Sequence, residues 1–186
     1  MIIGNFIKGT DLKYRNHYFS GICFNSLKCK KYNIFFAIKG TKIDGNRFIN
    51  HAIKKGAKTI ISNQKFEGIK KNILFIKSSN VRKSLSEFAY TIFRDKPKNI
   101  IAVTGTNGKS SIADFYFQIL RLNKKKVASI GTLGIKTQNY IKKVSNTTID
   151  PISLSIILNK LKKERINNVI LEASSHGLKQ NRLDGL

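Results

Sequence analysis

One run of the sequence combines a small-residue loop with a lysine and hydroxyl groups, a set suited to nucleotide phosphates. The apolar segment 99–104 precedes this loop, and the helix-compatible segment 112–122 follows it. Consecutive backbone N–H groups in such a loop form a nest for anions, and the following helix adds its own N–H groups and positive dipole end. Lys109 can reach the β and γ phosphates, and the Ser110 hydroxyl can bind the accompanying Mg²⁺. The residues expected to bind ATP are Thr104, Gly105, Thr106, Asn107, Gly108, Lys109, Ser110 and Ser111.

The spacing of this loop departs from the strict phosphate-binding pattern, which separates its first glycine from Gly-Lys by a longer stretch. Gly105 lies only three positions before Gly108. An ordinary glycine turn between a strand and a helix is the alternative interpretation. Such a turn requires neither Lys109 nor Ser110, so we favour a variant phosphate loop.

A second candidate group is the carboxylate of Glu172, which closes the apolar segment 168–172. In open α/β sheets, ligands bind beyond the carboxyl ends of the strands, so Glu172 and the loop can share one edge. A carboxylate there can hold Mg²⁺ opposite the Ser110 hydroxyl, as phosphoryl transfer requires. Taken alone, Glu172 is more often a surface carboxylate at the end of a strand. We therefore predict a catalytic pair, Lys109 and Glu172, with Ser110 and Glu172 as metal ligands.

The elements that must position these groups alternate between β-like and helical patterns. In the first half we expect strands at 34–38, 59–62 and 73–76 and helices at 47–55 and 82–94. In the second half we expect strands at 99–104, 126–130 and 168–172 and helices at 112–122 and 150–164. Asp150-Pro151 is a favourable helix start, with an acceptor at the cap and proline in the first turn. Strands that alternate with helices predict parallel sheets with right-handed crossovers.

A proline among charged residues at 95–98 interrupts these patterns and gives the best candidate for a domain boundary. We predict an α/β protein in which a small N-terminal α/β domain, residues 1–96, precedes a P-loop-type parallel-sheet ATPase domain, residues 97–186. With 186 residues, the chain is long enough for one sizeable core or two small ones.

The net charge of +25 would ordinarily indicate a nucleic-acid partner. Lysine doublets, however, recur in every part of the sequence, arginine is sparse, and no nucleic-acid-binding signature is evident. No segment is long and apolar enough to cross a bilayer, and no signal peptide is evident. We therefore expect a cytoplasmic monomer without a nucleic-acid or membrane partner. Cys23 and Cys29 are expected to be two reduced thiols, since no second pair or histidine cluster favours zinc.

The candidate phosphate loop and the segment around Glu172 resemble motifs of a known family, the Mur ligases, and within it the MurE type, which adds the third residue of the peptidoglycan stem peptide. Residues 104–111 match the ATP loop shared by Mur ligases and folylpolyglutamate synthetases. The run 172–178, followed by Gln180 and Arg182, resembles the MurE pattern more narrowly, and 146–148 matches the family's Asn-Thr-Thr segment. Segments 34–40, 44–49 and 52–57 resemble the N-terminal domain that receives the uridine end.

The resemblance implies roles for residues outside the phosphate loop. It assigns Ser26 and the segment 41–43, which begins with Thr41, to the UDP end of the sugar nucleotide. It assigns the muramoyl-peptide side to Asn146, Thr147, Thr148, Ser174, Gln180 and Arg182. Thr147 or Thr148 could instead simply satisfy loop backbone groups. His176 is more often a packed, hydrogen-bonded residue than a catalyst, and we assign it no catalytic role.

Two departures from the family pattern affect these expectations. Asn25-Ser26-Leu27 stands where the family commonly has Asp-Ser-Arg, which removes both charges and puts uridine-end affinity in question. Family members also continue beyond the matched region, through a carbamylated lysine, a metal-binding histidine and a C-terminal domain for the incoming amino acid. The resemblance therefore implies that the second domain is incomplete, and we expect the 186-residue chain alone to bind nucleotide weakly and not to complete ligation.

The reaction that the resemblance implies is ATP-dependent amide formation. The γ-phosphoryl group moves to a carboxylate of UDP-N-acetylmuramoyl-L-alanyl-D-glutamate, and an amine of meso-diaminopimelate or lysine attacks the acyl phosphate. The implied cofactors are ATP and Mg²⁺, and the implied partners are the UDP-N-acetylmuramoyl-dipeptide and an amino acid. A non-catalytic nucleotide-binding remnant and a folylpolyglutamate-type ligase are the alternatives.

Overall fold

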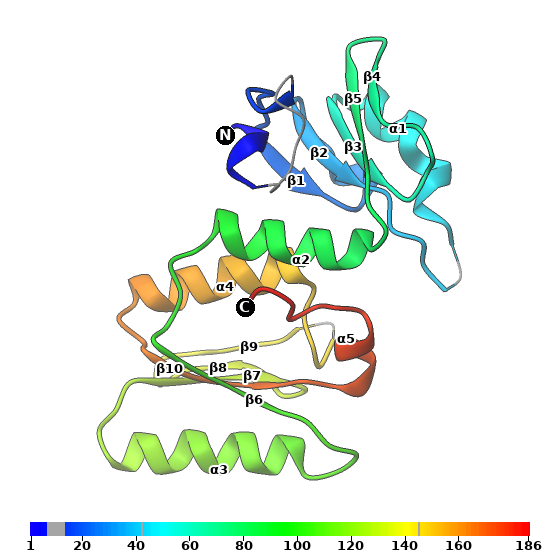
Figure 1. The fold of residues 1–186 in the computed structure, drawn as a ribbon. Coiled ribbons are helices and arrows are strands. Elements are labelled where there is room, and N and C mark those ends of the chain that lie inside the picture. Colours follow the sequence, from blue (N-terminus) through cyan, green and yellow to red (C-terminus); the bar gives the residue numbers. More distant parts are fainter. Residues whose placement is uncertain (7–13, 42, 145) are drawn as a thin grey trace. The chain divides into compact units, whose positions relative to one another are not determined.

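The structure is a computed structural model that describes residues 1–6, 14–41, 43–144 and 146–186 (Figure 1). The chain divides into two compact units, Met1–Phe88 and Ala89–Leu186. Each unit contains one sheet and helices, so the predicted α/β class is confirmed. The two units are described separately below.

The first unit is built on a five-stranded sheet in the order β1-β2-β3-β5-β4. Its strands are β1 (Gly21–Cys23), β2 (Asn33–Phe36), β3 (Thr59–Ser62), β4 (Gly68–Lys70) and β5 (Ile73–Lys77). All neighbouring strands are parallel except β4, which pairs antiparallel with β5 at the edge. Its helices are the 3₁₀ turns η1 (Ile3–Asn5), η3 (Ser26–Lys28) and η4 (Gly45–Phe48), then α1 (Ile49–Lys54) and α2 (Val81–Ile92), whose last residues belong to the second unit.

Alternation along β2 explains how this sheet is covered. Successive strand residues point to opposite faces. Phe35 packs in a buried cluster with Ile49 and Ala52 of α1. Phe36 points the other way, and its ring contacts that of Phe88 in α2 at 5.4 Å between centroids. A central strand buried on both faces is expected for a parallel sheet covered by helices.

The second unit contains a five-stranded sheet in the order β6-β10-β7-β8-β9. Its strands are β6 (Asn99–Val103), β7 (Val127–Gly131), β8 (Gly134–Lys136), β9 (Ile141–Lys142) and β10 (Asn168–Glu172). β10 pairs parallel with both β6 and β7, whereas β8 and β9 extend the sheet antiparallel. The helices are α3 (Lys109–Leu122), α4 (Pro151–Lys163) and α5 (Ser175–Lys179), and α3 and α4 lie on opposite faces of the sheet (Figure 1).

A buried hydrophobic core lies on the α4 face of this sheet. Leu154, Leu158 and Leu161 of α4 are buried against Val169 and Leu171 of β10. Asp150 caps α4 as predicted, because its side chain accepts a hydrogen bond from Ser153 N at 3.0 Å and Pro151 occupies the first turn. β10 lies between β6 and β7 in the sheet. Its carboxyl end is therefore next to the loops that follow these two strands.

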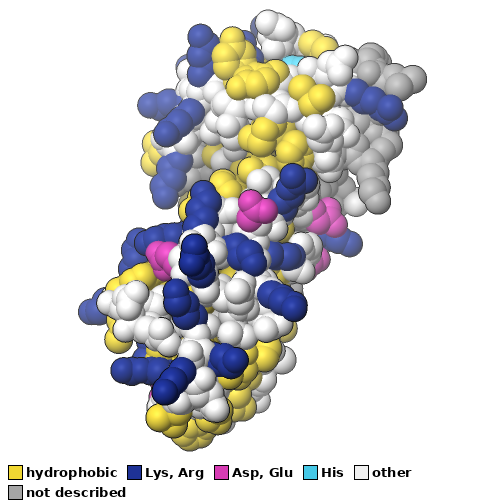
Figure 2. All heavy atoms as spheres, turned by 90° about the vertical axis from the view of Figure 1, so that its left-hand side faces the viewer, with side chains coloured by type: hydrophobic (Ala, Val, Ile, Leu, Met, Phe, Trp, Pro, Cys, Tyr) yellow, Lys and Arg dark blue, Asp and Glu magenta, His cyan; other side chains and the backbone are white. Residues whose placement is uncertain are grey.

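Lysine and arginine side chains are spread over the face shown in Figure 2, and few acidic side chains lie among them. None of the helices in the described ranges is long and apolar enough to cross a membrane.

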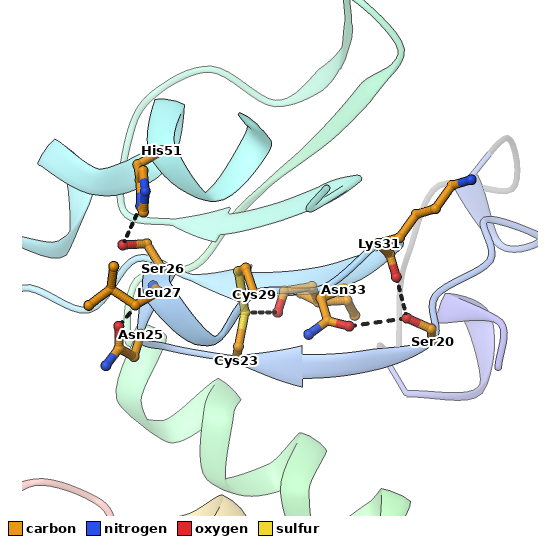
Figure 3. Close-up of a disulfide and its surroundings, with 10 residues drawn as sticks. Ser20, Cys23, Asn25, Ser26, Leu27, Cys29, Lys31, Asn33 and His51 are labelled. Atoms are coloured by element: carbon orange, nitrogen blue, oxygen red, sulfur yellow. Dashed lines mark hydrogen bonds between the residues drawn. A yellow bond between two sulfur atoms is a disulfide. The ribbon is translucent and has the colours of Figure 1, made fainter. Parts of the chain in front are cut away.

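One prediction about the first unit is wrong. Cys23 and Cys29 are not two free thiols but form a disulfide (Figure 3). Cys23 ends β1 and Cys29 follows the η3 turn, which reverses the chain and brings the two Cα atoms to 5.9 Å. That separation lies in the range that a disulfide needs. The number of cysteines and the expected compartment, on which the prediction of free thiols rests, do not reveal this turn.

Candidate active site

The predicted phosphate loop connects β6 to α3 with backbone conformations that favour glycine. Gly105 has φ of 148° and Gly108 has φ of 78°. Gly108 is also the cap residue of α3, and no side chain caps the first turn of that helix. The N–H groups of this turn are therefore available to an anion at the helix N-terminus.

The Lys109 side chain folds back over the loop. Its Nζ donates hydrogen bonds to the carbonyl oxygens of Gly105 at 2.6 Å and Thr106 at 3.1 Å. The ammonium group is thus held at the loop, beside the carbonyl oxygens of Gly105 and Thr106. An arriving phosphate would meet the positive charge and the helix N-terminus at the same place.

Glu172 lies beside this loop, as the strand order requires. In the sheet, Glu172 pairs with Val103, the last residue of β6, because β10 is the direct neighbour of β6. The Glu172 side chain is only 3% exposed, and its Oε2 accepts a hydrogen bond from Ser110 Oγ at 2.9 Å. The structure therefore brings together the two residues predicted to hold Mg²⁺.

The donor set fits a magnesium ion bound together with a nucleotide. Within the described ranges, no group of three His, Cys, Asp or Glu side chains is placed to hold a metal. One carboxylate and one hydroxyl are nevertheless what Mg²⁺ takes from a protein when phosphates and water complete its octahedron.

Sequence reasoning missed two residues that contact Glu172. Thr132 N donates to Glu172 Oε1 at 3.0 Å, and Thr132 Oγ1 donates to Oε2 at 3.1 Å. Gly131 lies so close that an added Cβ would overlap the carboxylate. The sequence signal is the Gly131-Thr132-Leu133-Gly134 run, whose two glycines indicate a tight turn directly after the strand.

Thr148 and Ser174, both predicted to hold the muramoyl-peptide side, hydrogen bond to each other and to the backbone. Thr148 Oγ1 donates to Glu172 O at 3.0 Å and accepts from Ser174 N at 2.8 Å. Ser174 Oγ lies 3.1 Å from Thr148 Oγ1 and caps α5 by accepting from Gly177 N at 3.1 Å. The backbone-satisfying alternative thus describes Thr148, and both hydroxyls tie the end of β10 to the segment before α4.

Gln180 and Arg182 form a second polar group next to Thr148. The Arg182 guanidinium donates to Gln180 Oε1 at 3.0 Å and 2.7 Å and also to the Thr148 carbonyl. Gln180 Nε2 lies 2.6 Å from His176 Nε2, so His176 is hydrogen bonded within this group. Tyr90 donates its hydroxyl to Arg182 O at 2.8 Å, and burial raises the pKa of Tyr90, which keeps it protonated as a donor.

The remaining predicted residues differ in exposure: Ser26 is buried, Thr147 is half-buried, and the others are exposed. Thr147 Oγ1 is 3.0 Å from Thr132 Oγ1, and Asn146 beside it is exposed. In the first unit, Ser26 Oγ is 3.0 Å from His51 Nδ1, and Asn25 accepts a hydrogen bond from Leu27 N at 3.0 Å (Figure 3). Thr41 is exposed, whereas Lys42 in the predicted 41–43 segment lies outside the described residues. Thr104, Thr106 and Asn107 are exposed residues of the loop, and Ser111 is an exposed residue in the first turn of α3.

Two models of one protein family match this chain. The model described as the Mur ligase middle domain matches residues 103–186, and the model described as Mur ligase family, catalytic domain, matches residues 18–97. The chain belongs to the Mur ligase family. The resemblance found in the sequence is thereby confirmed, and the described site lies in the part of this Mur ligase that matches the middle domain.

Curated relatives of this Mur ligase bear the name UDP-N-acetylmuramoyl-L-alanyl-D-glutamate--2,6-diaminopimelate ligase. The protein from Rickettsia prowazekii (strain Madrid E) is 41% identical over 174 residues, which cover 91% of this chain and 36% of the relative. The protein from Bradyrhizobium diazoefficiens is 39% identical over 167 residues, which cover 90% of this chain and 34% of the relative. The chain therefore spans about a third of the length of these relatives.

Two solved structures are similar to this chain. A structure of a protein with the same ligase name matches with a TM-score of 0.80 and 27% identity, over 100% of this chain and 38% of that one. A MurF ligase from Thermotoga maritima in complex with ADP matches with a TM-score of 0.54 and 23% identity, over 83% of this chain and 32% of that one. The second likeness concerns the fold alone.

Proposed function

We propose that this Mur ligase chain provides the ATP site of an amide ligase in peptidoglycan precursor synthesis. The proposed reaction adds meso-diaminopimelate, or lysine, to UDP-N-acetylmuramoyl-L-alanyl-D-glutamate through an acyl phosphate. The observation that carries the proposal is the 2.9 Å hydrogen bond between Ser110 and the buried Glu172, directly beside the loop and Lys109. The names of the curated relatives support the choice of substrates.

In the proposed reaction, the chain binds and orients the phosphates and does little covalent chemistry. The Lys109 ammonium would exchange the Gly105 and Thr106 carbonyls for phosphate oxygens, and the first turn of α3 would donate N–H groups. Ser110 and Glu172 would hold Mg²⁺, which offsets phosphate charge when bound. The activated group is a carboxylate, whose oxygen leaves readily only after phosphorylation.

The proposed sites for the other substrate follow from what the side chains already do. Thr147 and Asn146 lie at the surface beside Thr132, whereas Thr148 and Ser174 maintain the local backbone. Arg182 presents the planar donor set that pairs with carboxylates or phosphates. In the first unit, Ser26 and Thr41 are the proposed contacts for the UDP end. ATP and UDP-sugars are intracellular molecules, so we place this monomer in the cytoplasm.

Calorimetry with Mg·ADP tests the nucleotide site. We expect Lys109→Ala to weaken binding about tenfold or more, since it removes a charge-assisted phosphate contact. Lys125→Ala, which removes an exposed lysine near the other end of α3, is the matched control and should bind like the wild type. Equal affinities of the two variants would show that the loop does not bind phosphate.

A turnover assay with all three substrates tests the reaction itself. Amide product that depends on Lys109 would identify a ligase. Nucleotide binding without amide product is the expected result for the 186-residue chain alone, which spans about a third of the length of its curated relatives. Product with a folate-type acceptor in place of the muramoyl dipeptide would contradict the proposed substrate class.

A further inference from the structure

Both oxygens of the Glu172 carboxylate have donors, and Thr132 supplies most of them. Oε1 accepts from Thr132 N, and Oε2 accepts from Thr132 Oγ1 and from Ser110 Oγ. Ser110 is also the residue proposed to bind Mg²⁺. The two donors from Thr132 are therefore those that do not take part in the proposed metal and phosphate contacts.

The strand register explains why Thr132 is in this position. β7 and β10 run parallel with Ile130 opposite Leu171, so Gly131 follows one residue later beside Glu172. Gly131 has no Cβ, which leaves space for the carboxylate. Gly134, with φ of 100°, then starts the antiparallel return along β8. This short turn aims both the N–H and the hydroxyl of Thr132 at Glu172.

The Thr132 hydroxyl also reaches the segment assigned to the other substrate. Thr132 Oγ1 lies 3.0 Å from Thr147 Oγ1. A hydroxyl has one proton, so when Thr132 donates to Glu172 it accepts from Thr147. The resulting sequence of hydrogen bonds runs from Thr147 through Thr132 to Glu172 Oε2, the same oxygen to which Ser110 Oγ donates.

We infer that Thr132 is a positioning residue of the nucleotide site, which orients the Glu172 carboxylate for metal and links it to Thr147. The inference rests on the proposed function, because it concerns the same metal site. A residue that orients a metal-ligating carboxylate typically changes metal affinity about 10- to 100-fold when it is lost. A residue that only completes a turn would leave metal affinity unchanged.

Two substitutions separate these roles. Thr132→Val keeps the size and the backbone N–H but removes the hydroxyl, whereas Thr132→Ser keeps the hydroxyl. Thr59→Val is the matched control, because Thr59 is a fully buried residue of the first unit whose hydroxyl has no hydrogen-bond partner among the described residues. Thr147→Val tests the link to the substrate segment.

The readout is paramagnetic broadening of backbone amide signals by Mn²⁺ with ADP, which detects binding even when a small fraction of the protein is occupied. For the wild type, Mn²⁺·ADP should broaden the amide signals of Ser110, Thr132 and Glu172. Thr132→Val should require about tenfold more Mn²⁺ for the same broadening. Thr132→Ser and Thr59→Val should match the wild type. Thr147→Val should require a Mn²⁺ concentration between those of the wild type and Thr132→Val.

The outcomes distinguish the inference from the proposed function. Broadening of Thr132→Val at wild-type Mn²⁺ concentrations, with broadening lost in Lys109→Ala, would overturn the positioning role and leave the nucleotide site intact. Failure of Thr132→Ser to restore binding would also overturn it. No broadening around Ser110 in the wild type would overturn the nucleotide site and, with it, the role of Thr132.

Discussion

The position of the Glu172 side chain depends on a few neighbouring residues that the chain brings from far apart. Ser110 follows β6, Thr132 follows β7, and the carboxylate closes β10 between them. A buried carboxylate must find donors for its oxygens, because leaving it without them is costly. Its three donors therefore favour one orientation of the side chain.

Gly131→Ala tests this dependence at the residue scale. The added Cβ would overlap the Oε1, Cδ and Cγ atoms of Glu172, so this buried side chain must leave its observed position. We expect loss of Mg·ADP binding, measured by calorimetry. The unfolding free energy should decrease by about 1–3 kcal/mol.

Gly21→Ala is the control, because its Cβ would lie 3.4 Å from the nearest atom, Asn33 Oδ1. Retention of nucleotide binding by Gly131→Ala would mean that the observed carboxylate position is not needed for metal.

At the scale of elements, α3 has two faces with different environments. Phe117 and Ala113 are buried toward the sheet. The opposite face carries large apolar residues that are more than half exposed, namely Ile112, Phe115, Ile119 and Leu122. The burial of one face, rather than the hydrophobicity of the whole helix, determines which residues stabilise the second unit.

Two phenylalanines on α3 provide a matched test. Phe117→Ala should reduce the unfolding free energy by about 3–5 kcal/mol, because Phe117 is 1% exposed and its loss leaves a cavity. Phe115→Ala, at a position 62% exposed, should change it by no more than about 0.5 kcal/mol. Denaturant titration measures both, and equal losses would mean that the outer face of α3 is also packed.

At the scale of the whole molecule, positive side chains far outnumber negative ones, so repulsion between like charges outweighs attraction between unlike charges. The sequence has 35 lysine and arginine residues against 10 aspartate and glutamate residues, so most cations have no acidic residue to pair with. Ion pairs such as Lys136–Asp114 at 2.6 Å and Lys160–Glu164 at 3.5 Å offset little of this charge. A net charge of this size destabilises the compact state through self-repulsion.

We therefore expect the melting temperature to rise by a few degrees when sodium chloride increases from about 10 mM to about 150 mM, because the screening length falls from about 30 Å to about 8 Å. Differential scanning calorimetry measures this shift. Potassium fluoride should produce the same shift, since screening does not depend on the salt. A melting temperature that falls with salt would show that attractive ion pairs outweigh the repulsion.

The sequence by itself determined the features that depend on neighbouring residues. Local patterns of glycine, apolar residues and capping side chains predict the glycine loop before α3, the strand that Glu172 closes and the Asp150 cap of α4. The edge shared by Glu172 and Ser110 was also predictable, because parallel strands bring their carboxyl ends together.

Tertiary structure alone decided the contacts whose partners are far apart in sequence or joined by an unrecognised turn. Thr132 is 40 positions from Glu172, and only the β7–β10 register makes them neighbours. Thr148 and Ser174, 26 positions apart, come within hydrogen-bonding distance because the segment before α4 lies beside the end of β10. Cys23 and Cys29 meet because η3 turns the chain back. Composition and spacing specify which groups a chain carries, but strand register and turn geometry determine which groups come within hydrogen-bonding distance.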